Sequence, residues 1–317
     1  MLLKKLNYIF LILSIVVFTT SCKKDDNESL KSKGTVNIEI TDAPIDDASV
    51  SATFVTISKI MVDGEELSGF NKTTIDLMAY QNGDTKLLSN YELDAKAYSQ
   101  IDLVLDYDTD ANGNSPGCYV YNESENAKHK LNSESNEIKL NYNFLVEENS
   151  ESNLVIDFDL RKCVTRDPNN SDNYEFVTNS EMQSGIRVVN KDNVAVITGS
   201  CEDSMLTNSD KIVVYAYGKG SYNRDYECHG QGESNVEFSG AVTSSMVDSN
   251  GNYELHFLEE GEYELHYVSY KENANGELEI NGTLLVNAVG SIDLLSLSLN
   301  ANANVAVDVV VTGIVPV

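Results

Sequence analysis

The chain has 317 residues, of which 22 are basic and 50 are acidic, so its formal net charge at pH 7 is −28. This charge would repel a polyanion, and no basic stripe with interleaved aromatic residues offsets it, so we expect no nucleic-acid partner. The length suffices for two domains of ordinary size, each with a hydrophobic core of its own.

The first 22 residues have the organisation of an export signal. Lys4 and Lys5 precede an apolar run from Tyr8 to Phe18, and three small residues separate that run from Cys22. The run is about half of the roughly 20 residues that a helix needs to cross a bilayer, so it predicts a cleaved signal peptide. The ending Thr-Thr-Ser-Cys resembles a lipobox, in which the cysteine becomes the acylated N-terminus of a lipoprotein.

That resemblance implies a signal peptide over residues 1–21 and lipidation of Cys22 by diacylglycerol and a fatty acid such as palmitate. Each buried CH₂ of the lipid contributes about 0.8 kcal/mol, so several chains would hold the protein stably on a membrane. The alternative is an ordinary secretory signal with a chance cysteine. Removing residues 1–21 takes away two lysines and no acid, which leaves 20 basic and 50 acidic residues and a net charge of −30.

A charged cluster from Lys23 to Glu28 follows the cysteine. It resembles the export signal that sends lipoproteins of the Bacteroidota to the outer face of the outer membrane, and so implies a lipid-anchored protein that faces the cell exterior. The alternative is a solvated tether over residues 22–33, which have almost nothing to bury. Both interpretations can hold at once.

Hydrophobic periodicity beyond residue 33 is almost everywhere two rather than 3.6. Val36, Ile38 and Ile40 alternate with polar residues, and the same alternation runs through residues 101–107 and 138–146. Such segments are strands with one buried face, and segments rich in Asn, Asp, Gly and Ser separate them. The pattern predicts an all-β protein that consists of two antiparallel β-sandwich domains in tandem.

Five stretches of the first half share one family resemblance. Gly34 to Pro44 is a strand that ends in the turn Thr-Asp-Ala-Pro, Leu154 to Leu160 is a late strand, and residues 55–62, 74–77 and 98–103 lie between them. Together they resemble a family known only as domain of unknown function 4382, common in exported bacterial lipoproteins, although the family's glycine just before the 98–103 stretch is missing. The resemblance assigns residues 34–190 to this domain and implies no catalytic residues.

Three acidic residues of this domain invite a functional interpretation. Asp157 and Asp159 lie on one side of a strand, where two carboxylates can serve acid–base catalysis or bind a cation. The alternative is structural: Asp42 caps a turn through backbone amides, and the other two side chains face water. Because no His, Ser or Cys accompanies them, we expect no catalysis here.

The second half contains the stretches Asp248 to Leu255 and Glu260 to Leu265, preceded by strands at 196–200 and 213–217. These resemble the carboxypeptidase regulatory-like domains, small transthyretin-like sandwiches, and the resemblance assigns residues 191–317 to a non-catalytic module of this type.

Alternation within this module predicts a β-hairpin of residues 253–257 and 263–267. Its strands would bring together a patch that consists of His256, His266, Glu254 and Glu264. Two histidines and two glutamates can bind Zn²⁺. Cross-strand charge pairing on a solvated face explains the same pattern equally well.

Four cysteines remain beyond Cys22, two in each predicted domain. Of the three possible connectivities, only Cys118–Cys163 with Cys201–Cys228 keeps each bridge within one domain. Loop entropy gives these closures about 4 and about 3.6 kcal/mol. The alternative of free thiols used as ligands or nucleophiles lacks CxxC spacing and a nearby basic partner.

The loop from Asp108 to Gly113 places oxygen ligands at alternate positions, Asp108, Asp110 and Asn112, with a glycine at the sixth. This spacing matches the first half of an EF-hand loop and predicts a calcium site. Tyr119 stands where the bidentate glutamate is needed, so an ordinary polar turn is the alternative. The sequence suggests no other cofactor.

Binding is the function class that the sequence favours. The chain has four scattered histidines and neither a G-x-S-x-G nor an HExxH motif. Its loops, such as residues 217–232, are rich in Asn, Ser, Gly and Tyr, which suit adaptable hydrogen bonding. We predict a non-catalytic binding or adhesion module for a glycan or protein ligand, although no Trp is present and Tyr would have to provide stacking. The alternatives are an envelope hydrolase and a purely structural or assembly component.

Overall fold

The computed structural model describes residues 32–43, 50–123, 125–167, 170–205, 207–273 and 278–317. The predicted signal peptide, lipidation site Cys22 and charged cluster therefore lie outside the described residues. No helix of the described part combines the length and the apolar character that crossing a membrane would require.

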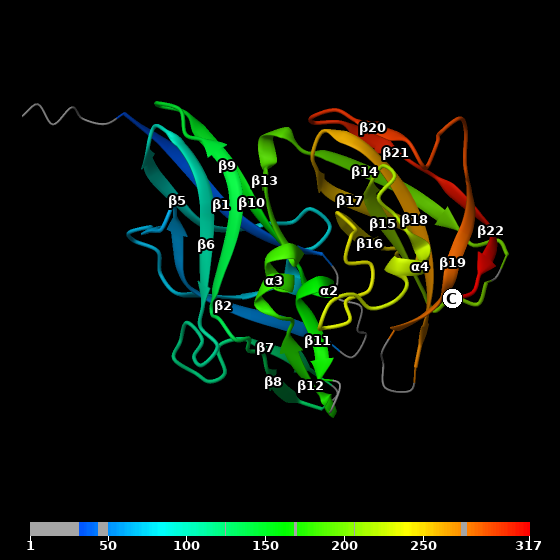
Figure 1. The fold of residues 1–317 in the computed structure, drawn as a ribbon, viewed down its shortest axis with the longest axis horizontal. Coiled ribbons are helices and arrows are strands. Elements are labelled where there is room, and N and C mark those ends of the chain that lie inside the picture. The colour runs from blue at the N-terminus through cyan, green and yellow to red at the C-terminus, as the bar shows by residue number, and fades with distance from the viewer. Residues whose placement is uncertain (1–31, 44–49, 124, 168–169, 206, 274–277) are drawn as a thin grey trace, which may run out of the picture. The chain divides into compact units, whose positions relative to one another are not determined.

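Two sheets form the first half of the molecule (Figure 1). One has the order β13 (Ile186–Asn190), β10 (Glu151–Asp159), β1 (Lys33–Ala43) and β5 (Lys86–Asp94). The other has the order β8 (Ala127–Lys130), β7 (Tyr119–Asn122), β2 (Ala52–Val62), β6 (Ala97–Leu105) and β9 (Glu137–Leu145), with β3 (Glu65–Glu66) and β4 (Thr73–Asp76) also paired to β2. Apolar residues of both sheets share one buried core, so the two sheets form a sandwich.

The central pair of the first sheet departs from the antiparallel expectation. β1 and β10 run parallel, with Thr35 opposite Glu151 and Thr41 opposite Asp157. Parallel neighbours need a long crossover connection. Here the chain between them builds β5 and the whole second sheet before it returns as β10.

Two short helices and a two-stranded sheet follow β10 and lead back to its neighbour β13. They are α2 (Leu160–Cys163), the pair β11 (Val164–Asp167) and β12 (Asn170–Phe176), and α3 (Asn179–Gly185). α3 begins with a capping box, in which Thr178 and Glu181 satisfy each other's backbone amides.

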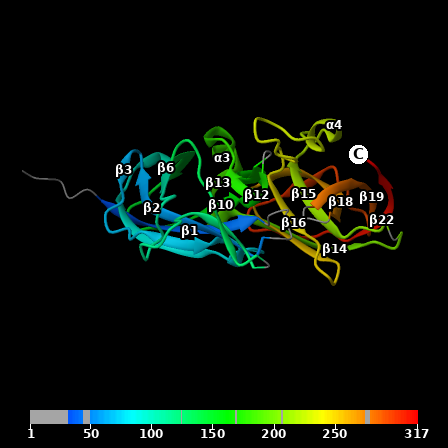
Figure 2. The ribbon, with the colours of Figure 1, turned by 90° about the horizontal axis from the view of Figure 1, so that it is seen from below.

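A nine-stranded arrangement forms the second half (Figures 1 and 2). Its main path is β16 (Thr243–Met246), β15 (Lys211–Gly218), β18 (Gly261–Glu272), β19 (Leu278–Ala288), β22 (Val309–Val315), β14 (Ala195–Glu202) and β17 (Asn252–Leu258), with β20 (Leu297–Leu299) on β18 and β21 (Asn304–Ala306) on β14. α4 (Arg224–Glu227) lies in the connection after β15.

One strand joins the two layers of this second sandwich. β14 pairs with β17 over most of its length, whereas its last residues, Cys201 and Glu202, pair with β22. Strands of both layers contribute to one core, as in Leu255 of β17 and Leu265 of β18. The predicted all-β class with tandem β-sandwiches is thereby confirmed, while the exact domain boundaries stay a prediction.

The predicted hairpin of residues 253–267 is wrong. β17 pairs with β14, and β18 pairs with β15, β19 and β20. The turn between them carries the chain from one layer to the other, so their apolar faces meet across the core, where the hydroxyl oxygens of Tyr253 and Tyr267 are 2.8 Å apart. The alternation of apolar residues indicated that both strands face a common core, and it did not indicate that they pair in one sheet.

The predicted disulfides Cys118–Cys163 and Cys201–Cys228 are not formed, and all four thiols are free and buried. Cys118 lies beside β2, where the Thr56 amide donates to its Sγ atom, whereas Cys163 ends α2. Cys201 packs in the main core of the second sandwich, and Cys228 packs in a separate apolar cluster beside it. Cys118 and Cys163 belong to the same core of the first sandwich, but the Cys118 Sγ accepts from the Thr56 amide and the Cys163 Sγ lies 3.9 Å from the Met182 carbonyl oxygen. An even number of cysteines in each domain therefore did not predict the pairing.

Candidate functional site

The three acidic residues singled out in the sequence do come together, but in the interior. Asp42, Asp157 and Asp159 are 5%, 4% and 5% exposed. Asp42 accepts hydrogen bonds from the Leu160 amide at 3.1 Å and from Gln81 Nε2 at 3.1 Å. The expectation that Asp157 and Asp159 face water is therefore wrong, because other parts of the fold cover that side of β10.

Arg187, on β13, is the partner of Asp157. Its Nε donates to Asp157 Oδ2 at 2.9 Å, and its Nη2 lies 2.6 Å from the same oxygen. Its Nη1 donates to the backbone carbonyl of Phe257 at 2.6 Å, at the end of β17. One guanidinium thus links the last strand of the first sandwich to the second sandwich.

Arg161 and Lys162, on α2, make a parallel link. Arg161 Nη2 donates to Asp159 Oδ2 at 3.0 Å, and its Nη1 donates to the carbonyls of Glu237 and Phe238 at 2.8 and 3.1 Å. Lys162 Nζ donates to the carbonyl of Ala241 and lies 3.6 Å from Asp159 Oδ2. We call the set that consists of Asp42, Asp157, Asp159, Arg161, Lys162 and Arg187 the junction cluster.

Burial governs the ionisation of the junction cluster. Desolvation raises the pKa of Asp42 well above its usual value, although hydrogen bonds from Gln81 and Leu160 oppose the shift. Desolvation also raises the pKa of Asp157 against the pull of Arg187. It lowers the pKa of Lys162, which Asp159 partly restores.

Two aromatic residues receive these arginine bonds in an unusual backbone conformation. Phe238 and Phe257 have φ values of 49° and 57°, a region that bulky residues rarely occupy. The ring of Phe238 stacks on Tyr215 with centroids 4.3 Å apart, and Phe257 packs with Val155 of β10. Such strain persists only where surrounding contacts fix it, so the arginine bonds and the ring contacts together determine this junction.

The junction cluster has a structural role, because it connects the two sandwiches. Asp157 and Asp159 are each bonded to an arginine, and both arginines also bond to backbone carbonyls of the second sandwich. The neighbouring thiol of Cys163 is buried, which raises its pKa and keeps it protonated. Substrate must be able to reach a catalytic proton acceptor or nucleophile. These side chains are buried and are hydrogen-bonded or ion-paired with one another.

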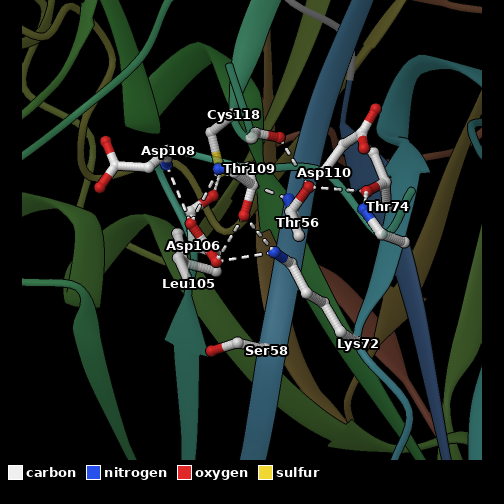
Figure 3. Close-up of polar contacts among 12 residues, drawn as sticks. Thr56, Ser58, Lys72, Thr74, Leu105, Asp106, Asp108, Thr109, Asp110 and Cys118 are labelled. Carbon is white, nitrogen blue, oxygen red and sulfur yellow. Dashed lines mark hydrogen bonds and ion pairs between the residues drawn. The ribbon is translucent and has the colours of Figure 1, made fainter. Parts of the chain in front are cut away.

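The predicted calcium loop forms a set of tight polar turns instead of an ion cage (Figure 3). Asp110 Oδ1 accepts from the backbone amides of Asn112 and Asn114, both at 2.8 Å. Asp108 points away from Asp110, is paired with Lys130 at 2.7 Å and has an 84% exposed side chain. The carboxylates of Asp108 and Asp110 therefore do not face a common ion position. Among the described residues, no cluster of three or more His, Cys, Asp or Glu side chains is placed to hold a metal.

Asp106 is the organising residue of this loop, and the sequence motif did not single it out. It accepts from Lys72 Nζ at 2.7 Å and from the amides of Asp108 and Thr109 (Figure 3). Partial desolvation alone would raise its pKa, but these hydrogen bonds prevail and lower the pKa to about 2. Its signal in the sequence is its position directly after β6, where a short acidic residue commonly starts an Asx turn.

A polar groove of about 580 Å³ lies beside this loop. Its lining includes Tyr107, Asp108, Lys130, Asn132 and Asn136. Tyr107 is anchored through a hydrogen bond from its hydroxyl to the Ser135 carbonyl at 2.7 Å. The groove therefore combines a fixed aromatic residue with amide, carboxylate and ammonium groups on a surface that solvent reaches.

The patch of histidines and glutamates is not assembled. His256 Nε2 lies 2.8 Å from Glu254 on its own strand, and His266 Nε2 lies 3.7 Å from Glu264 on another. The ring of His266 stacks on Tyr222 with centroids 3.6 Å apart. The two pairs lie on strands that are not neighbours in the sheet, which removes the cross-strand geometry that a zinc site required.

A family model described as "Domain of unknown function (DUF4382)" matches residues 33–200, more than half of the chain. The chain belongs to the DUF4382 family. The matched region contains the first sandwich, all six residues of the junction cluster and all but the last residues of β14. The resemblance of the first half to domain of unknown function 4382 is thereby confirmed, and the match runs ten residues past the predicted boundary at 190. No curated protein matches the chain.

Solved structures give only distant likenesses. They include the TIE protein of Bacillus anthracis (12% identity, TM-score 0.20, 88% of this chain and 34% of that chain). The major pilin subunit of Bacillus cereus (9%, 0.21, 88% and 71%) and a protein of Parabacteroides distasonis described as a cell adhesion protein (9%, 0.21, 89% and 99%) are further examples. The chain spans about a third of the length of the first, and TM-scores this low carry no argument about its function.

Asp106 gives a prediction for pH and stability. A folded-state pKa of about 2 lies below the unfolded value near 3.8, so the contribution of Asp106 is present above pH 3.8 and is lost as pH falls through 2. Allowing for solvent screening, Asp106→Asn should lower the free energy of unfolding at pH 7 by about 1–2 kcal/mol, and by much less at pH 2. Urea unfolding at the two pH values measures this.

The matched control is Asp108→Asn, which changes a largely exposed partner in the same loop. Its effect should stay below about 0.5 kcal/mol at either pH. An equal loss for Asp106→Asn at pH 2 and pH 7 would show that the residue acts through packing and not through its charge.

Proposed function

We propose that the protein is a cell-envelope lipoprotein that acts as a non-catalytic binding module, with a surface glycan as its ligand. The observation that carries this proposal is the commitment of Asp157 and Asp159 to buried arginine pairs. The carboxylates best placed for acid–base chemistry therefore hold the scaffold together, and the groups that remain for a ligand are the hydrogen-bonding side chains of the surface.

The polar groove is the surface that best suits a glycan. Asn132 and Asn136 offer both donors and acceptors, and the charged pair of Asp108 and Lys130 offers further partners for sugar hydroxyl groups. The turns fixed by Asp106 and Asp110 hold the edge of the groove in place, which reduces the entropy lost on binding.

The proposed location on the outer membrane rests on the sequence of the N-terminal segment. A lipid on Cys22 would hold the protein on the outer membrane, and the charged cluster that follows would send it to the exterior face. The polar tether would then hold the binding surface away from the lipid headgroups.

Replacement of the lipidated cysteine tests the anchor. Cys22→Ser should move the protein from the membrane fraction to the soluble fraction and abolish labelling with a radioactive fatty acid, because the thiol that carries the lipid is gone. Fractionation and labelling of cells that express each form measure this. Unchanged membrane attachment of the variant would exclude lipidation at this site.

Glycan binding is tested with the soluble fragment Lys23–Val317 on a glycan array, followed by calorimetry with the best ligand. Asn132→Ala should weaken that ligand about tenfold, as expected for loss of one hydrogen bond worth about 1.5 kcal/mol. Glu92→Ala, on the exposed edge strand β5, is the control and should bind normally.

Two results would contradict the binding module. One is an array without any ligand whose affinity depends on Asn132. The other is reproducible turnover of a polysaccharide or peptide that disappears in Asp157→Asn or Asp159→Asn while the fold survives, since that would place the protein among the envelope hydrolases.

A further inference from the structure

A second pocket, of about 310 Å³, lies at the junction of the two sandwiches. One wall comes from α3, through Ser180, Glu181, Ser184 and Gly185, and the other from the segment 231–239. Carbon atoms form most of the surface that lines the pocket, and Lys162 of the junction cluster contributes to this lining. The pocket therefore exists only while the two sandwiches are held together.

Among the residues that line the pocket, Lys162 is the basic one. The residue is only 8% exposed, and its partners are the Ala241 carbonyl and, at 3.6 Å, Asp159 Oδ2. An ammonium group has three N–H donors, so these two partners leave a third. A buried ammonium donor is costly unless it is satisfied, which favours a ligand with an acceptor oxygen.

Charge balance favours an anionic acceptor. Three cationic side chains of the junction cluster face three carboxyl groups, and Asp159 is shared by Arg161 and Lys162. Asp42 accepts from Gln81 Nε2 and the Leu160 amide, so the ion pairs of the three cations are with two carboxylates, Asp157 and Asp159.

The one acidic residue of the lining, Glu181, is already satisfied. Its Oε1 accepts from the Ser234 amide, and its Oε2 accepts from the hydroxyl groups of Ser234 and Thr178. These donors stabilise its negative charge, so it does not need Lys162 as a partner.

We propose that the junction pocket binds a small aliphatic monocarboxylate. The carboxylate accepts from Lys162 Nζ, and the hydrocarbon chain lies against Val236 and the backbone at Gly185. A volume near 310 Å³ is at the small end of the range for ligand pockets, which suits a short chain and excludes a large glycan. This site is separate from the polar groove and does not depend on the proposed glycan.

Hexanoate is the probe, and calorimetry and thermal unfolding of the Lys23–Val317 fragment are the readouts. Hexanoate should bind saturably and raise the melting temperature, because it binds the folded state alone. Hexanamide, which has the same shape without the charge, should bind at least about tenfold more weakly. Equal binding of acid and amide, or no binding of hexanoate at about 10 mM, would overturn the proposal.

Two variants separate binding from folding. Lys162→Met keeps the aliphatic stem and removes the donor, so a folded variant should lose hexanoate binding. Ser239→Phe fills the pocket without touching an ionic partner of the cluster and should also abolish binding, whereas Ser249→Phe, on an exposed turn of the second sandwich, should bind normally. Hexanoate binding that survives Ser239→Phe would place the ligand elsewhere and contradict the assignment.

Discussion

The buried ion pairs of Asp157 with Arg187 and of Asp159 with Arg161 are the interaction on which the rest of the structure depends. Taking such charges out of water costs several kcal/mol for each ion, and only close pairing with further hydrogen bonds offsets the cost. Here the extra bonds come from backbone carbonyls of the second sandwich, at Phe257 and Phe238. Separating the sandwiches would leave these charges without part of their compensation, so the pairs hold the two halves in one arrangement.

This arrangement explains why the acidic residues are spaced as they are. Asp157 and Asp159 lie two residues apart on β10 and are both covered by the second sandwich, so each can direct one arginine across the junction. Phe238 and Phe257 accept these bonds at the cost of an unfavourable φ, which their ring contacts offset. The junction thus creates the pocket beside Lys162, while the polar groove stands on the first sandwich alone.

Local alternation was sufficient to predict the strands, as in Val36, Ile38 and Ile40, and the tandem sandwiches. It was insufficient for pairing, because Tyr253 and Tyr267 show only that each strand buries one face, and both a hairpin and two facing layers satisfy that. The junction cluster could not be predicted from the sequence either, because the residues that cover Asp157 lie about 100 positions later in the chain. The predicted disulfides were wrong because an even number of cysteines does not show which thiols lie close together.

Calorimetric unfolding of the Lys23–Val317 fragment tests most directly whether the buried pairs hold the sandwiches as one unit. We predict a single transition whose calorimetric and van't Hoff enthalpies agree, and two resolved transitions for Arg187→Met, because that change leaves Asp157 buried without its cation. Lys59→Met, which removes an exposed pair with Glu66, should keep the single transition. Two transitions in the unmodified protein, or a single unshifted transition in Arg187→Met, would contradict the account.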